Sequence, residues 1–145
     1  NLLIARAGGE AIDLEATPSS VGILYSEEGV LSHANNFLAL PLYPGSGDRL
    51  VSLGPNTIVR TGRVRRLLRM KKGNLDIEAF KEILRDHYNY PYSICRHRNL
   101  STPEDMRCET LASVIMDLDE RSLYIANGPP CKNEYIEYRV TTKEQ

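Results

Sequence analysis

The first part of the chain alternates apolar and polar positions in a way that predicts β-strands. Two runs, Asn1 to Arg6 and Ala11 to Ala16, flank the segment AGGE. Adjacent glycines between such runs indicate a hairpin, because both accept a positive φ. The runs VGILYS and GVLSHANNF around EEG indicate a second hairpin. Together the four runs predict an antiparallel meander.

A loop and two helices are expected in the middle of the chain. The segment LPLYPGSGDRLVSLGPN is rich in proline and glycine, which predicts the loop. Helices are predicted over residues 57–72 and 76–88, with KKGN as the break between them. Asp76 fits the N-cap of the second helix, because its carboxylate can accept a hydrogen bond from a free backbone N–H.

Three further strands are predicted in the last third, in the segments CETLASVIMDL, RSLYIANG and NEYIEYRV. The order is therefore strands, two helices and strands again. This segregation predicts an α+β fold with the helices on one face of an antiparallel sheet. A length of 145 residues fits a single domain or subunit, residues 1–145.

Composition narrows the class of protein. The chain is 41% hydrophobic and 26% charged, as is typical of a globular protein, and its net charge is -1. With a net charge so close to zero, no overall electrostatic field attracts nucleic acid or a membrane surface. No apolar run reaches the roughly 18 residues of a membrane-spanning helix, and no signal peptide is recognised. We expect a cytoplasmic protein that binds neither nucleic acid nor membrane.

The first predicted helix carries many cations between residues 60 and 72. Val64, Leu67 and Leu68 form one apolar stripe, and Arg60 falls on that stripe one turn earlier. The cations expected on the opposite side are Arg65, Arg66, Arg69 and Lys72. A guanidinium that points inward must be paired or hydrogen-bonded. Arg60 is thus either a structural ion-pair partner, a snorkelling side chain, or an arginine of a functional site.

The cysteines form neither a disulfide framework nor a CxxC metal pair. Cys95, Cys108 and Cys131 are odd in number and widely spaced. The chain also contains three histidines, which are His33, His87 and His97. A zinc site built from these residues is conceivable, but their spacings match no usual pattern of zinc ligands. We expect buried or unreactive thiols.

The stretch HANNFL ends the fourth predicted strand with two asparagines. Strand interiors disfavour asparagine, because its side chain competes for backbone hydrogen bonds. Asn35 and Asn36 are adjacent, so their side chains would point to opposite faces of a strand and only one could line a cleft. The pair either terminates the strand or directs an amide at a ligand.

Several blocks of the sequence resemble one enzyme family. The blocks are GEAIDLEATP, HANNFL, LDIEAFKEILRDHYNYPYSICRH, TLASVIMDL and GPPCKNEYIEY. In this order they resemble the acyl-coenzyme A:isopenicillin-N acyltransferase family, from Asn1 to about Val140. Members are autoproteolytic N-terminal-nucleophile hydrolases. The resemblance implies part of an αββα sandwich, of which this chain supplies about half, and it implies neither a cofactor nor a metal.

The resemblance also assigns catalytic residues. In the wider superfamily an asparagine at this strand end acts as an oxyanion-hole donor, which implies that role for Asn35. Asn36 stands where the family usually has histidine, so it receives no role. The block TIVRTGRV resembles one in which an arginine lies near the nucleophile. Arg60 is the better-placed candidate and Arg63 is the alternative.

The nucleophile implied by the resemblance is not among the residues of this chain. In the family, autoproteolysis exposes a cysteine whose own α-amine serves as base. The chain opens at Asn1, without Met, and its three cysteines are internal. We therefore expect the C-terminal part of a catalytic region, as a processed subunit or a fragment.

The implied partners follow from that chemistry. They are the N-terminal segment or chain that carries the nucleophile cysteine, and a small acylated amide substrate. Acyl-coenzyme A is an open alternative as acyl donor, and a homo-oligomer is open as well. A different class of function also stays open: a non-catalytic interaction or anion-binding subunit that uses the basic helix over residues 60–72.

Overall fold

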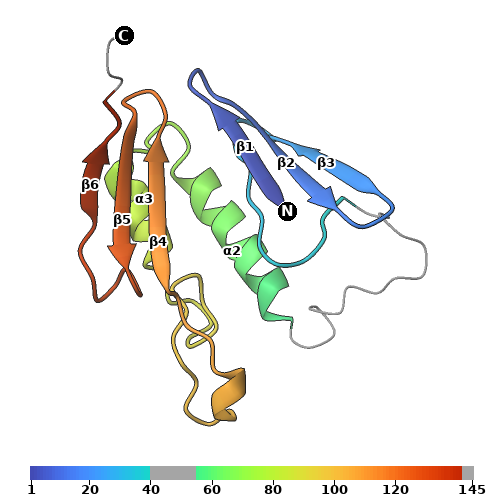
Figure 1. Ribbon diagram of the computed structural model, residues 1–145, viewed down its shortest axis with the longest axis vertical. Helices are drawn as coiled ribbons and strands as arrows, with labels where there is room; N and C mark the ends of the chain where they lie inside the picture. The colour runs from blue at the N-terminus through green and yellow to red at the C-terminus, as the bar shows by residue number, and fades with distance from the viewer. Residues whose placement is uncertain (40–54, 142–145) are drawn as a thin grey trace. The chain divides into compact units, whose positions relative to one another are not determined.

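A computed structural model describes residues 1–39 and 55–141 (Figure 1). Most of the predicted proline- and glycine-rich loop lies outside the described residues. The chain divides into two compact units, Asn1–Met70 and Lys71–Gln145. Both units contain strands and a helix, which confirms the α+β class. The single-domain expectation remains a prediction, because two compact units can belong to one domain.

The first unit contains a three-stranded antiparallel sheet. Its strands are β1 (Leu2–Arg6), β2 (Glu10–Ala16) and β3 (Val21–Tyr25), in the order β1-β2-β3. Gly8 and Gly9 in the first turn have φ values of 91° and 89°, a region that glycine enters without steric cost. The predicted first hairpin is therefore confirmed.

The predicted fourth strand is wrong. After β3 the chain makes one isolated bridge between Glu27 and Val30, and residues 31–39 contain no strand. Gly29, at φ 77°, lets the chain turn tightly at this bridge. Beyond it, Asn35 and Asn36 bond to side chains of the following helix. His33 and the Leu38 N–H bond to the side chain of Glu15 in β2, so none of these bonds is a backbone–backbone bond to a neighbouring strand. The predicted hairpin thus shrinks to a short turn.

The helix α2 (Asn56–Met70) completes the first unit and matches the predicted helix over 57–72 closely. Its buried residues are Thr57, Thr61 and Leu68. Arg60, Val64 and Leu67 are half-buried, as the stripe predicted. The cations predicted to face solvent are exposed: Arg65, Arg66, Arg69 and, just beyond the helix, Lys72.

The second unit combines a short helix with a second antiparallel sheet. The helix α3 (Ile77–Leu84) begins at Asp76, whose Oδ1 accepts a hydrogen bond from the Ala79 N–H at 2.7 Å. This confirms the predicted N-cap. A 3₁₀ turn, η1 (Glu104–Met106), precedes the sheet. The strands are β4 (Ala112–Asp117), β5 (Ser122–Asn127) and β6 (Ile136–Arg139), and α3 packs against β4.

The second helix ends earlier than the sequence predicted. Helix α3 stops at Leu84 rather than Tyr88. After it, the Cys95 N–H donates to the Asp86 carbonyl at 3.0 Å, so the chain folds back on itself. This tertiary hydrogen bond competes with continuation of the helix. The predicted helix end rested on a local apolar stripe, which carries no information about such a bond.

Each sheet has one apolar face, because residues directly opposite one another across strands share a face. In the first sheet that face carries Leu2, Ile4, Ile12, Leu14, Val21, Ile23 and Tyr25. In the second sheet it carries Val114, Met116, Leu123, Ile125, Ile136 and Tyr138. Several of these side chains are strongly exposed within the described residues, for example Leu2 at 59% and Met116 at 66%.

Candidate catalytic site

The two residues assigned to catalysis meet in the first unit. Asn35 lies in the loop after β3, and Arg60 lies in the first turns of α2. The Arg60 Nη2 donates to the Asn35 side-chain oxygen, Oδ1, over 2.6 Å. The backbone N–H of Asn35 also donates to the Thr57 hydroxyl at 2.8 Å. The helix therefore holds Asn35 by both its backbone and its side chain.

This contact fixes the direction of the Asn35 amide. A guanidinium only donates hydrogen bonds, so the amide atom facing Arg60 must be the oxygen. The amide nitrogen, Nδ2, then points away from Arg60, on an exposed residue. It makes no hydrogen bond to any residue that the structure describes. The arrangement presents an oriented N–H donor at the surface of the unit.

Asn36 has the opposite environment. It is 7% exposed, and its side-chain oxygen accepts hydrogen bonds from the hydroxyls of Thr57 at 2.9 Å and Thr61 at 3.2 Å. Its Nδ2 donates to the Phe37 carbonyl at 3.3 Å. The side chains of both asparagines therefore bond to α2, and both residues lie in a loop and not in the predicted strand. They differ in burial, since Asn35 is exposed and Asn36 is buried. Asn36 binds the loop to the helix.

The same unit contains a buried acidic cluster that the sequence patterns did not predict. Asp13 and Glu15 lie in β2 and are fully buried. The Glu15 carboxylate accepts a hydrogen bond from His33 Nε2 over 2.5 Å, and the same nitrogen lies 3.7 Å from Asp13. The sequence signal for this cluster was the segment AIDLEA, in which the two acids are two residues apart and therefore lie on the same face of the strand.

Glu15 also anchors the loop that carries the asparagines. Its two carboxylate oxygens accept hydrogen bonds from the N–H groups of Leu38 at 2.7 Å and Ala39 at 2.9 Å. Burial by itself would raise the pKa of Glu15. The hydrogen bonds from His33 and from the two backbone N–H groups outweigh burial, so the pKa of Glu15 lies below its ordinary value. An ionised Glu15 therefore holds the loop from the side of the sheet.

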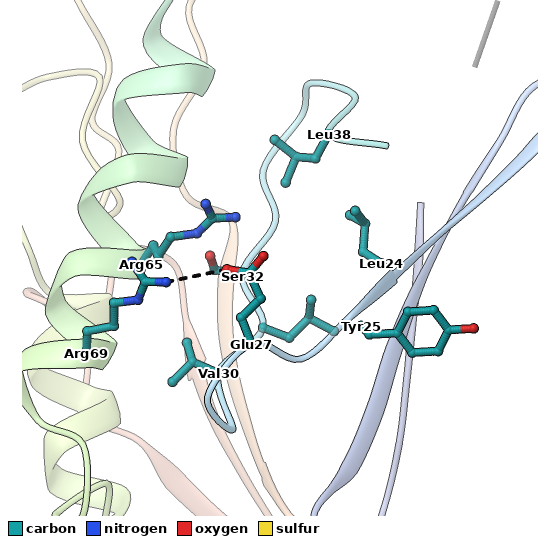
Figure 2. A pocket seen from close by; sticks show the side chains of 9 residues that line it. Leu24, Tyr25, Glu27, Val30, Ser32, Leu38, Arg65 and Arg69 are labelled. Atoms are coloured by element: carbon teal, nitrogen blue, oxygen red, sulfur yellow. Dashed lines mark hydrogen bonds and ion pairs between the residues drawn. The ribbon is translucent and has the colours of Figure 1, made fainter. Parts of the chain in front are cut away.

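A pocket next to this loop contains two of the basic residues of α2 (Figure 2). Arg65 and Arg69 line it together with Leu24, Val30, Ser32 and Leu38. Arg69 forms an ion pair of 3.4 Å with Glu27, and both side chains are largely exposed. The Ser32 hydroxyl is buried and has no hydrogen-bond partner within the described ranges. The pocket therefore offers cations and one hydroxyl donor.

The three cysteines all lie in the second unit. Cys95 is fully buried, and burial is the main reason that its pKa rises to about 11. Cys108 and Cys131 are exposed. None has a free α-amine beside it, which is the base an N-terminal nucleophile uses. A neutral, buried thiol such as Cys95 is a poor nucleophile.

The residues that could hold a metal are also in the second unit. The side chains of His87, Cys95, His97 and Cys131 gather in one cluster. Burial, followed by the nearby charges of His87 and Lys132, lowers the pKa of His97. A neutral imidazole is the form that coordinates metals. No metal was predicted here from the spacing of these residues.

None of the helices among the described residues is both long enough and apolar enough to cross a membrane.

A comparison with protein families identifies the class. A family model described as acyl-coenzyme A:6-aminopenicillanic acid acyl-transferase matches residues 1–132. The chain belongs to this family, which confirms the resemblance drawn from the sequence blocks. A search of curated proteins found no significant match. Membership implies an enzyme of the acyltransferase or hydrolase type.

Proposed function

We propose that this chain is the oxyanion-binding part of an amide hydrolase or acyltransferase that works through an acyl-cysteine intermediate. The nucleophile would be an N-terminal cysteine on a segment or chain outside these residues. Asn35 would donate its Nδ2–H to the oxyanion, and Arg60 would act as the positioning residue for Asn35. The observation that carries the proposal is the 2.6 Å bond from Arg60 to Asn35 Oδ1.

The proposed reaction has two acyl transfers. The cysteine sulfur attacks the carbonyl carbon of an amide or a thioester, and its proton passes to the α-amine. The carbonyl oxygen becomes an anion, which Asn35 stabilises by hydrogen bonding. Collapse of this intermediate breaks the bond to the amine or thiol, and that leaving group takes up the proton. Water or an acceptor amine then attacks the acyl-cysteine and restores the thiol.

The arrangement around Asn35 suits this role for an electrostatic reason. An oxyanion donor must already be oriented before charge develops, since reorientation during the reaction costs free energy. Asn35 is held at its backbone by Thr57 and at its side-chain oxygen by Arg60. The positive guanidinium also polarises the amide, which strengthens its N–H as a donor.

We further propose that the units belong to an αββα sandwich. In such a fold, two sheets face each other across a layer of apolar side chains. Each sheet of this chain has an apolar face with exposed side chains, such as Ile23 at 47% and Ile136 at 59% exposure. Faces of this kind are expected to be covered in the complete protein.

A second candidate function rests on the pocket of Figure 2. Arg65 and Arg69 line it beside the buried Ser32 hydroxyl, which has no partner among the described residues. An anionic ligand could bind there without any catalysis. The net charge of -1 and the ion pair of Arg69 with Glu27 both weaken this candidate.

The test is to trap the acyl-enzyme. The chain is joined to its nucleophile-bearing segment, incubated with an acyl-coenzyme A, quenched in acid and analysed by peptide mass spectrometry. We expect one acyl group, carried by the N-terminal cysteine. Substrate-dependent acylation of Cys95, Cys108 or Cys131 in the isolated chain would contradict the proposal, as would the absence of any acyl-enzyme in the complete protein. Binding of acyl-coenzyme A that requires Arg65 but leads to no turnover would favour the anion-binding function.

A further inference from the structure

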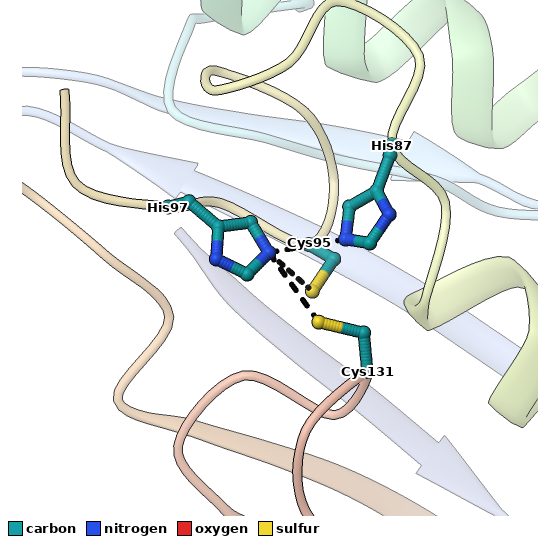
Figure 3. Close-up of side chains that lie close together, drawn as sticks. All are labelled: His87, Cys95, His97 and Cys131. Atoms are coloured by element: carbon teal, nitrogen blue, oxygen red, sulfur yellow. Dashed lines mark hydrogen bonds between the residues drawn. The ribbon is translucent and has the colours of Figure 1, made fainter.

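Four side chains of the second unit bring metal-binding atoms together. They are His87, Cys95, His97 and Cys131, and their nitrogen and sulfur atoms all lie within 4.8 Å of one another (Figure 3). The His97 Nε2 lies 3.0 Å from the His87 Nε2. It also lies 3.6 Å from the Cys95 sulfur and 3.4 Å from the Cys131 sulfur.

Hydrogen bonding alone does not explain this cluster. An imidazole nitrogen carries either one proton or one lone pair, so it forms one good hydrogen bond. The His97 Nε2 has three neighbours at bonding distance, and at most one of them can be its partner. A cation placed between the four atoms would satisfy all of them at once, because each atom would direct its lone pair at the ion.

The distances fit a tetrahedral zinc site. With a Zn–S bond of about 2.3 Å and a Zn–N bond of about 2.05 Å, a tetrahedron places two nitrogens about 3.3 Å apart and a nitrogen and a sulfur about 3.6 Å apart. The corresponding distances here are 3.0 Å between the nitrogens, and 3.4 and 3.6 Å from nitrogen to sulfur. The other three pairs of atoms lie within 4.8 Å, so side-chain shifts of about 1 Å bring all four atoms to tetrahedral coordination.

We propose that His87, Cys95, His97 and Cys131 bind one zinc ion. Two thiolates and two imidazoles form a donor set that favours zinc over magnesium or calcium, which prefer oxygen ligands. Two thiolates also neutralise the charge of the ion, so the site is electrically balanced although Cys95 and His97 are buried. Binding releases the two thiol protons to solvent.

The backbone around the cluster is already arranged for the ion. The Cys95 N–H donates to the Asp86 carbonyl at 3.0 Å, and the His97 N–H donates to the Pro91 carbonyl at 2.9 Å. The Arg85 Nε donates to the Pro130 carbonyl at 2.9 Å, which brings the Cys131 turn to the end of α3. These bonds hold the segments that carry the four ligands together, so binding of the ion costs less conformational entropy.

The role of the ion follows from its coordination. Four protein ligands fill a tetrahedral shell, so no position remains for water or substrate, as in structural zinc sites. The ion would link the loop after α3, which carries His87, Cys95 and His97, to the β5–β6 connection, which carries Cys131. It would therefore stabilise the second unit rather than take part in acyl transfer.

The test measures metal directly. The chain is purified without chelator and under reducing conditions, and zinc is quantified by inductively coupled plasma mass spectrometry. Metal-free protein is then titrated with Co²⁺, whose tetrahedral thiolate complexes show visible d–d bands and a near-ultraviolet charge-transfer band. Variants Cys95→Ser and Cys131→Ser each remove one ligand. Cys108→Ser is the matched control, because this exposed thiol lies outside the cluster.

We expect about one zinc ion per chain in the wild type and in Cys108→Ser, and at least a tenfold lower zinc content in Cys131→Ser. Removal of the zinc by a chelator should lower the melting temperature of the wild type. Equal zinc loss in Cys108→Ser would overturn the proposal. A reduced wild-type protein that binds neither zinc nor cobalt would also overturn it. The proposal would be overturned in the same way if that protein, when oxidised afterwards, formed a Cys95–Cys131 disulfide. If a ligand variant fails to fold, the cobalt spectrum of the wild type decides: a charge-transfer band supports the site and its absence refutes it.

Discussion

The adjacent residues Asn35 and Asn36 provide the sharpest test of the proposed catalytic site, because they differ in what they contact. Asn35→Ala removes an exposed amide whose Nδ2 has no partner among the described residues. We expect nearly unchanged stability and a kcat lower by roughly 10²–10³, the usual effect of losing one oxyanion-hole donor. The comparison is made in the complete enzyme, with its nucleophile present.

Asn36→Ala should show the reverse pattern. It removes the acceptor of the Thr57 and Thr61 hydroxyls, and Asn36 is 7% exposed. Thr61 can donate instead to the Thr57 carbonyl at 2.9 Å, so one buried hydroxyl is left without an acceptor. That costs about 1–3 kcal/mol of folding free energy and lowers the melting temperature of the enzyme. The rate constant of the folded enzyme should change far less than in Asn35→Ala.

The assay pairs kinetics with thermal melts on both variants. Release of the coenzyme A thiol from an acyl-coenzyme A, the acyl donor of the proposed reaction, gives kcat, and circular dichroism gives the melting temperature. A slow Asn36→Ala enzyme beside a fast Asn35→Ala enzyme would show that the wrong amide has been assigned. If both variants turn over at the wild-type rate, the loop has no catalytic amide and the site assignment fails.

Three further predictions follow from single contacts. Arg60→Ala should lower kcat by roughly 10–100-fold, which is the value of one charge-assisted hydrogen bond. Arg60→Lys should recover part of the lost kcat. Equal rates in the two variants would exclude positioning by charge. Glu15→Gln should lower the melting temperature at neutral pH. Because the folded pKa of Glu15 is depressed, its stabilisation is complete above the ordinary value of 4.5 and is lost as the pH falls through the lower folded pKa, so the two melting curves should converge below about pH 4.5. His33 and Asp13 face Glu15, and a difference that stays constant down to pH 3 would contradict this account. Asp76→Ala should cost about 1 kcal/mol through loss of the α3 N-cap, while Glu78→Ala, which removes a carboxylate side chain that is 71% exposed, should be nearly neutral in denaturant titration.

Local patterns predicted the elements that local physics determines. The glycine pair between two apolar runs gave the first hairpin, and the apolar stripe of α2 placed Arg60 on the inner side of the helix. Asp76 was found because an N-cap depends on residues within one turn. The Asn35–Arg60 contact was accessible as well, since the stripe and the family resemblance indicated the two partners separately.

Long-range contacts explain where sequence reasoning failed. The fourth strand was wrong because the polar groups of HANNFL bond to side chains far away in sequence: Asn35 and Asn36 bond to Thr57, and the Leu38 N–H bonds to Glu15. The His and Cys cluster was missed for the same reason. Its ligands are separated by up to 44 positions, and the bonds from Arg85 to Pro130 and from Cys95 to Asp86 bring them together. No ligand-spacing motif encodes such a site.

Thr57 connects the proposed oxyanion donor of this loop to the buried residue beside it. Its hydroxyl accepts a hydrogen bond from the Asn35 backbone N–H and donates one to the Asn36 side chain. One buried side chain of α2 therefore fixes the backbone of the proposed donor residue and satisfies the buried residue beside it. The geometry of Asn35 then depends on Asn36 only through Thr57 and the intervening peptide. The rate effects of the two asparagine variants should accordingly differ even though the residues are adjacent, because Arg60 holds the Asn35 side chain independently of Asn36.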